Sequence, residues 1–137
     1  MAIIDYKNEF SDAQAVTVTA ASTDHINLTN TTPQYAGGID TLVIVRVNTA
    51  FAGGTSIIAS LETDDNASFS SATTVVTGPT VLTAAAVAGK NLLVFNLKDA
   101  QLEQYIQVKY TVSGTMSAGN VDAFISHTND SGVPAVA

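Results

Sequence analysis

The segment covering residues 104–125 constrains the fold of this chain more than any other. Within residues 106–112, apolar or aromatic side chains alternate with polar ones, and a small-residue turn at 113–115 leads into a second apolar stretch that ends at Ile125. An alternation of period two places successive side chains on opposite faces of a β-strand. The segment therefore predicts two strands at the edge of a β-sandwich rather than part of an active site.

The rest of the chain repeats this pattern in short segments that end in turn-forming residues. The predicted strands cover residues 16–19, 25–28, 41–48, 55–63, 73–77, 91–97, 104–112 and 119–125. Apolar residues at helical spacing do not persist, so only residues 82–88 and 99–103 are candidates for a helical turn. The sequence predicts an all-β fold, a single-domain antiparallel β-sandwich of about eight strands with little helix.

Length and local composition suggest three parts. The chain has 137 residues, which fits one domain. We expect residues 1–10 to form an N-terminal arm and residues 11–128 to form the sandwich. Residues 129–137, which contain Gly132 and Pro134, are expected to form a flexible C-terminal tail.

Composition excludes several classes of partner. Acidic residues outnumber basic ones by 12 to 5, which gives a net charge of −7. Such a chain repels nucleic-acid phosphate and anionic lipid, so we expect neither a nucleic acid nor a membrane as partner. The longest apolar runs are too short to span a bilayer, and the first ten residues lack the pattern of a signal peptide. There is no cysteine for a disulfide or a thiolate metal site.

Strand alternation also predicts which side chains face the core. The inward residues are Val43, Val45, Val47, Ile57, Ala59, Leu61, Leu93, Phe95, Leu97, Ile106, Val108, Tyr110 and Val112. The same reasoning leaves five apolar residues on outward faces: Leu42, Ile44, Ile58, Leu92 and Val94. A free monomer seldom exposes a large contiguous apolar patch. Either loops and the N-terminal arm cover these residues, or they form a subunit interface.

The sequence offers no constellation of residues that predicts catalysis. His25 and His127 lie in no acid–base or metal motif, and there is no Gly-x-Ser-x-Gly or phosphate-binding loop. The acidic run at 64–66 lacks calcium-loop spacing. It is better interpreted as a strand-to-loop corner in which Asp and Asn bond nearby backbone and Phe69 anchors the loop. We therefore expect no enzyme activity, no cofactor and no metal.

Three segments resemble one family of viral proteins. Residues 10–17 read Phe-Ser-Asp-Ala-Gln-Ala-Val-Thr, residues 61–71 run from Leu61 through Asp-Asp-Asn to Ser-Ser, and residues 105–124 hold the alternating strand and its successor. Their order and spacing resemble the capsid cement, or decoration, proteins of tailed bacteriophages. One departure is Gln104, where relatives are expected to carry an arginine.

The resemblance implies a jelly-roll protein on the outer surface of an icosahedral capsid, made in the host cytoplasm. Its implied partners are the major capsid protein and a second copy of itself, with a homodimer favoured and a trimer possible. It would staple neighbouring capsid subunits after the shell expands. For contacts with capsid or subunit we expect apolar residues of the arm together with two outward strand residues: Ile3, Ile4, Tyr6, Phe10, Leu42 and Ile44.

Two other functions stay open from the sequence. One is a carbohydrate-binding or adhesin-type β-sandwich on a virion or cell surface, although tryptophan is absent and the four tyrosines are scattered along the chain. The other is a hydrolase on a jelly-roll or cupin scaffold, which would need clustered His and carboxylate ligands.

Overall fold

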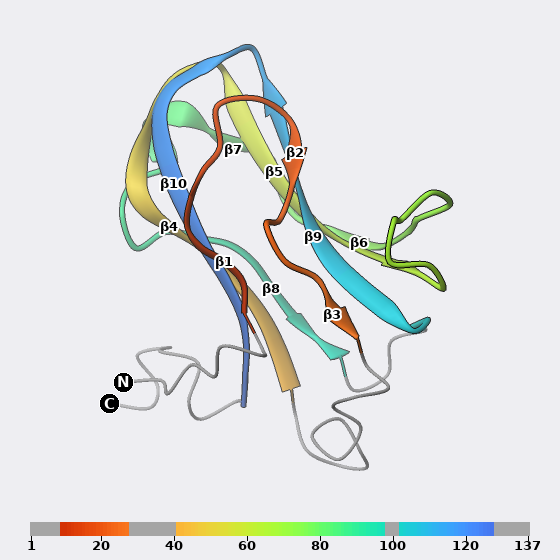
Figure 1. The fold of residues 1–137 in the computed structure, drawn as a ribbon. Coiled ribbons are helices and arrows are strands. Elements are labelled where there is room, and N and C mark those ends of the chain that lie inside the picture. Colours follow the sequence, from red (N-terminus) through yellow and green to blue (C-terminus); the bar gives the residue numbers. More distant parts are fainter. Residues whose placement is uncertain (1–8, 28–40, 98–101, 128–137) are drawn as a thin grey trace.

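Two antiparallel sheets packed face to face make up the protein (Figure 1). The computed structural model describes residues 9–27, 41–97 and 102–127. Sheet A contains, in spatial order, β1 (Glu9–Ala15), β10 (Met116–His127), β4 (Thr41–Gly53) and β8 (Asn91–Asn96). Sheet B contains β2 (Ala20–Ala21) and β3 (Ile26–Asn27) on one side of β9 (Tyr105–Ser113), and β5 (Ser56–Asp64) with β6 (Thr73–Thr77) and β7 (Val81–Leu82) on the other.

The strands pair from the outside of the sequence inward. The first strand pairs with the last, β2 and β3 pair with β9, β4 pairs with β8, and β5 pairs with β6 and β7. A chain that pairs in this nested way and is then rolled over itself forms a jelly roll, an architecture of two Greek keys in a double sheet. The predicted all-β jelly-roll sandwich is confirmed.

Two turns side by side carry the chain from one sheet to the other. The β4–β5 turn and the β9–β10 turn are hydrogen-bonded to each other, with Gly54 N donating to Thr115 O at 2.8 Å and Thr55 N donating to Ser113 O at 2.8 Å. Both turns use a glycine in the left-handed region, Gly53 at φ 86° and Gly114 at φ 83°. The prediction that β9 and β10 form an edge is therefore wrong, because they lie inside different sheets.

The core between the sheets follows the predicted alternation. Every residue predicted to point inward belongs to the core cluster or packs against it, with Phe95 and Val112 only partly buried. One residue predicted to face outward, Leu92 of β8, also lies in the core, and a β-bulge explains why. The register shifts between Val45 and Arg46, which leaves Leu92 as the extra residue of β8, and Leu92 joins Leu93 in the core at 1% exposure. Leu92 was predicted to face outward, and that prediction is wrong.

The N-terminal strand starts earlier than the sequence indicated. Glu9 and Phe10 belong to β1, not to an arm, while the predicted strand at 16–19 is a bend after β1. Two register shifts interrupt the pairing of β1 with β10, and Ala13 at φ 48° lies in the second. In a bulged edge strand, apolar and polar residues do not alternate regularly, so a search for a period of two does not find the strand.

Helix is scarce among the described residues, as predicted. The candidate turn at 82–88 contains one 3-10 helix, η4 (Thr83–Ala85). Most of the second candidate, 99–103, lies outside the described residues, as do residues 1–8 of the predicted arm and the predicted tail at 129–137.

Candidate interaction surfaces

The outward face of sheet A carries an apolar row across three strands. Every second residue of β4 from 43 to 47 points into the core, so Ile44 points outward. Ile44 lies opposite Phe124 of β10 and opposite Val94 of β8. We call these three residues the outer row.

The residues of the outer row differ in their exposure to solvent. Ile44 and Phe124 are each 1% exposed, whereas Val94 is 46% exposed. The guanidinium carbon of Arg46 lies 5.3 Å from the centroid of the Phe124 ring, within the range of a cation–π contact. Leu42 is partly buried. The free chain therefore covers Ile44 itself, and Val94 is the accessible apolar residue of the row.

The other predicted contact residues divide into two groups. Phe10 is 0% exposed and belongs to the core cluster, so its ring is unavailable to a partner. Ile3, Ile4 and Tyr6 lie outside the described residues. Of the two explanations for outward apolar residues, cover by the chain itself holds for Ile44, while Val94 keeps the interface explanation open.

The outward face of sheet B is polar by comparison. On its central strands, Glu62 of β5 accepts a hydrogen bond from Gln107 Nε2 of β9 at 3.0 Å. Ser60 Oγ donates to the backbone oxygen of Lys109 at 3.4 Å. Ile58, an outward apolar residue of β5, is partly buried. Leu82 of β7, which lies opposite Ser56, is 59% exposed, so sheet B also presents one apolar side chain, but the apolar row across three strands belongs to sheet A.

A chain of hydrogen bonds that runs from a buried pair to the surface involves two residues of the segment at 10–17. The Tyr110 hydroxyl lies 2.7 Å from Ser11 Oγ, which donates to Gln14 Oε1 at 2.6 Å. Gln14 in turn accepts from Thr23 N at 2.8 Å and donates to the oxygen of Ala21 at 3.0 Å. Because these residues come from β1, β2, β9 and the loop after β2, the network joins the two sheets. We call it the clasp, and its role is structural.

Carboxylates gather around β1. Burial raises the pKa of Glu9, and the nearby charges of Asp12, Asp122 and Asp24 raise it further. Asp122 has structural partners of its own, since its carboxylate accepts from Ala13 N at 2.6 Å and from Asn48 Nδ2 at 2.9 Å. Within the described residues, no group of three or more His, Cys, Asp or Glu side chains could hold a metal ion.

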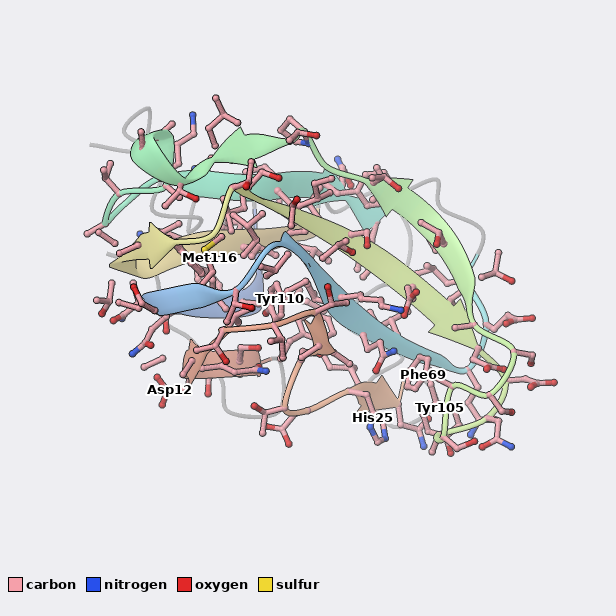
Figure 2. The ribbon with its side chains drawn as sticks, turned by 90° about the horizontal axis from the view of Figure 1, so that it is seen from above. Asp12, His25, Phe69, Tyr105, Tyr110 and Met116 are labelled. Carbon is pink, nitrogen blue, oxygen red and sulfur yellow. The ribbon has the colours of Figure 1, made fainter. Side chains whose placement is uncertain are left out.

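Three aromatic rings meet at one end of the sandwich. His25, just before β3, packs edge-on against Phe69 of the β5–β6 loop, with centroids 5.8 Å apart, and against Tyr105 of β9, with centroids 5.4 Å apart. Figure 2 shows the three side chains together at one side of the view, away from Asp12 and Met116. His25 is exposed and the other two rings are partly buried. We call this group the aromatic cluster.

The loop that carries Phe69 is held by its own hydrogen bonds. Asp64 accepts from Asn66 N at 3.3 Å and from Ser71 N at 2.9 Å, and Asn66 Oδ1 accepts from Ser68 N at 2.8 Å. Burial works to raise the pKa of Asp64, but hydrogen bonds from Ser71 and Asp65 outweigh it and lower that pKa. The predicted strand-to-loop corner is confirmed.

The aromatic cluster itself was missed from the sequence. His25 was expected to be an ordinary surface or edge residue, and the tyrosines were considered scattered. The only available signal was strand register, because β3 pairs with the first residues of β9 and so brings His25 near Tyr105. His127 is the last residue of β10.

Fold and surfaces together define a single jelly-roll β-sandwich with an apolar row across the outer face of sheet A. A family model described as Bbp16 matches residues 10–125, which is most of the chain, and the chain belongs to that family. The match covers the clasp, the outer row and the aromatic cluster. No curated protein matches the sequence. No helix among the described residues is long and apolar enough to cross a membrane.

Proposed function

We propose that this protein is a non-enzymatic bacteriophage capsid cement protein. It binds the outer surface of an icosahedral shell, staples neighbouring major capsid proteins and so stabilises the head. The observation that carries the proposal is the outer row of sheet A, an apolar row in which Val94 is 46% exposed beside Ile44 and Phe124. On the outward side of sheet B, Ser60 and Glu62 are buried and hydrogen-bonded, and Leu82 of β7 is 59% exposed.

This arrangement suits a protein that works by occupying a surface. A contact that buries about 800 Å² on each partner is the usual scale for a stable interface. Smaller contacts suffice when one protein touches adjacent subunits at once, because the second contact forms at a high effective concentration. A rigid sandwich that joins two subunits therefore stabilises a shell without strong affinity for either one.

Charge is the second support. The net charge of −7 suits a position on the outside of the virion, away from the genome, and an Arg- and Lys-rich partner surface. The partners are the major capsid protein and a second copy of this chain, most simply as a homodimer. The protein is made in the host cytoplasm before it joins the virion.

Co-sedimentation with expanded empty shells of the phage that encodes the protein tests the proposal. Light scattering at several protein concentrations gives the oligomeric state beforehand. We expect a dimer or trimer that sediments with shells at a saturating ratio. A monomer that stays in the supernatant with shells present would contradict the proposal.

Paired variants test the contrast between the faces. Val94→Glu places a charge on the apolar face of sheet A, and Thr111→Glu places the same charge on an exposed position of sheet B. We expect Val94→Glu to weaken shell binding or dimer formation and Thr111→Glu to leave both unchanged. Equal effects of the two variants would show that sheet A is not the contact face.

A carbohydrate-binding or adhesin-type module is the second candidate, and the aromatic cluster is the observation that favours it. Aromatic rings supply large, rigid contact area at low cost in conformational entropy. A glycan array separates the candidates, because a cement protein is expected to bind no glycan on it.

A further inference from the structure

We propose that the aromatic cluster and the carboxylates beside it dock an arginine or lysine side chain from a basic protein surface. The inference rests on the proposed function in one respect, namely that the major capsid protein supplies this surface. The meeting of three rings at one end of the sandwich and the acidic residues next to them in the chain support it.

Three exposed carboxylates flank the aromatic cluster in the chain. Asp24 directly precedes His25, Asp65 opens the β5–β6 loop, and Glu103 lies just before β9. Two hydrogen bonds place the backbone of Glu103 near Tyr105 of the cluster: its N–H donates to Thr63 Oγ1 at 2.8 Å, and that hydroxyl donates to the oxygen of Tyr105 at 2.9 Å. We call these three carboxylates the acidic rim.

The lysines and arginine of the described residues lie elsewhere. Arg46 covers the Phe124 ring on sheet A. Lys109 lies opposite Ser60, in the middle of sheet B. Lys90 follows η4, and its N–H bonds the oxygen of Val87. The charge of the acidic rim is therefore complementary to an external cation.

Phe69 has a conformation that core packing does not explain. Its φ is 51°, in the left-handed region, which costs a non-glycine residue about 1 kcal/mol. Its ring is nevertheless only partly buried. A bulky residue kept in this conformation points to a function at the site. The hydrogen bonds of the loop hold the ring in place before any partner arrives, which lowers the entropy lost on binding.

The chemistry of the site favours a cation over an uncharged ligand. A guanidinium or ammonium group within about 6 Å of an aromatic face is attracted by the ring, and a neighbouring carboxylate adds a charge-assisted hydrogen bond. Arginine fits best, since its planar group stacks on a ring while its N–H groups reach an acid.

Two substitutions at the site and one matched control test the proposal in shell binding. Phe69→Leu keeps an apolar side chain without a π face, and Glu103→Gln removes one charge of the acidic rim. Asp12→Asn removes the same charge from an exposed residue away from the cluster (Figure 2). We expect Phe69→Leu and Glu103→Gln each to weaken binding about two- to fivefold at low salt, and Asp12→Asn to leave it unchanged. Unfolding midpoints confirm that each variant is folded.

The outcomes separate this inference from the proposed function. Shell binding by the native protein that neither site variant weakens would overturn the inference alone. So would an equal loss for Asp12→Asn and Glu103→Gln, since net charge would then be the cause.

If the native protein does not bind shells, the proposed function fails, and an NMR titration then tests whether the aromatic cluster binds a cation. The probes are a short arginine peptide, a matching glutamate peptide and N-acetylglucosamine. Shifts of the Phe69 and Tyr105 ring signals with the arginine peptide alone support the inference. Shifts with the sugar, or no shifts at all, overturn it.

Discussion

Removal of either end of the Ser11–Tyr110 hydrogen bond should destabilise the protein to unequal extents. Tyr110→Phe removes the phenol hydroxyl, but Ser11 keeps Gln14 Oε1 as its acceptor at 2.6 Å. A single lost hydrogen bond of this kind lowers the free energy of unfolding by about 1 kcal/mol. Ser11→Ala instead leaves the Tyr110 hydroxyl without this partner at a site with 0% exposure.

An unsatisfied buried hydroxyl adds its desolvation cost, so we expect Ser11→Ala to lower the free energy of unfolding by about 2–3 kcal/mol. In the double variant no hydroxyl is left unpaired. Its loss of unfolding free energy should therefore be no larger than that of Ser11→Ala alone, which corresponds to a coupling energy of at least about 1 kcal/mol between the two sites.

Urea unfolding followed by circular dichroism measures these differences. With a slope of about 2 kcal/mol per molar urea, Ser11→Ala should lower the midpoint by about 1–1.5 M and Tyr110→Phe by about 0.5 M. Equal midpoints for the two single variants, or an additive loss in the double variant, would refute the clasp as a connected network.

Three further predictions concern Phe10 and the two groups with shifted pKa values. Phe10→Ala should lower the free energy of unfolding by about 3–5 kcal/mol. Val18→Ala, at a residue that is 53% exposed, should change it by less than about 0.5 kcal/mol. Similar urea midpoints for the two variants would show that Phe10 does not pack in the core. Burial raises the pKa of Tyr110, so its contribution to stability is complete below the unfolded value of about 10 and decreases as pH rises through the folded value. Urea midpoints between pH 9 and 11 should fall more steeply for the native protein than for Tyr110→Phe, and parallel curves would contradict this. Burial works to raise the pKa of Asp64, but the hydrogen bonds of Ser71 and Asp65 lower this pKa below 3.8. The contribution of Asp64 to stability is therefore present above its pKa in the unfolded chain, and it is lost as pH falls through its pKa in the folded protein. Asp64→Asn should therefore lower the midpoint at pH 7 and flatten its loss below pH 4, and an unchanged acid profile would argue against this assignment.

Sequence patterns predicted the interior of the sandwich well. The longer strands from β4 to β10 pack one face against the opposite sheet, so nearly every second residue faces the core, and the bounds of β6 match the prediction at both ends. Where a bulge adds a residue, as at Leu92, alternation assigns the wrong face.

The start of β1, the strand at one edge of sheet A, was not predicted, and the reason is different. The residues of β1 that bond the clasp are polar, so Ser11 and Gln14 resemble loop residues although Ser11 is 1% exposed. A small-residue turn also does not reveal whether its two strands pair or cross between sheets, since Gly114 permits either path. The mistaken placement of β9 and β10 together at an edge follows from that ambiguity.

The candidate sites depend on tertiary structure in the same way. Cover of Ile44 and Phe124 by other parts of the chain cannot be deduced from a strand pattern, which gives direction but not exposure. The aromatic cluster joins three segments distant in sequence, which meet only through the register of β3 with β9 and the shape of the β5–β6 loop. Local hydrogen bonding in that loop was predictable, because Asp and Asn bond nearby backbone wherever strands end.

Electron cryo-microscopy of expanded shells incubated with the protein tests the cement function most directly. Our account predicts jelly-roll density on the outer surface, in contact with at least two neighbouring major capsid proteins. Shells without such density at saturating protein, or density that touches only one subunit, would contradict the proposal that the protein staples the shell.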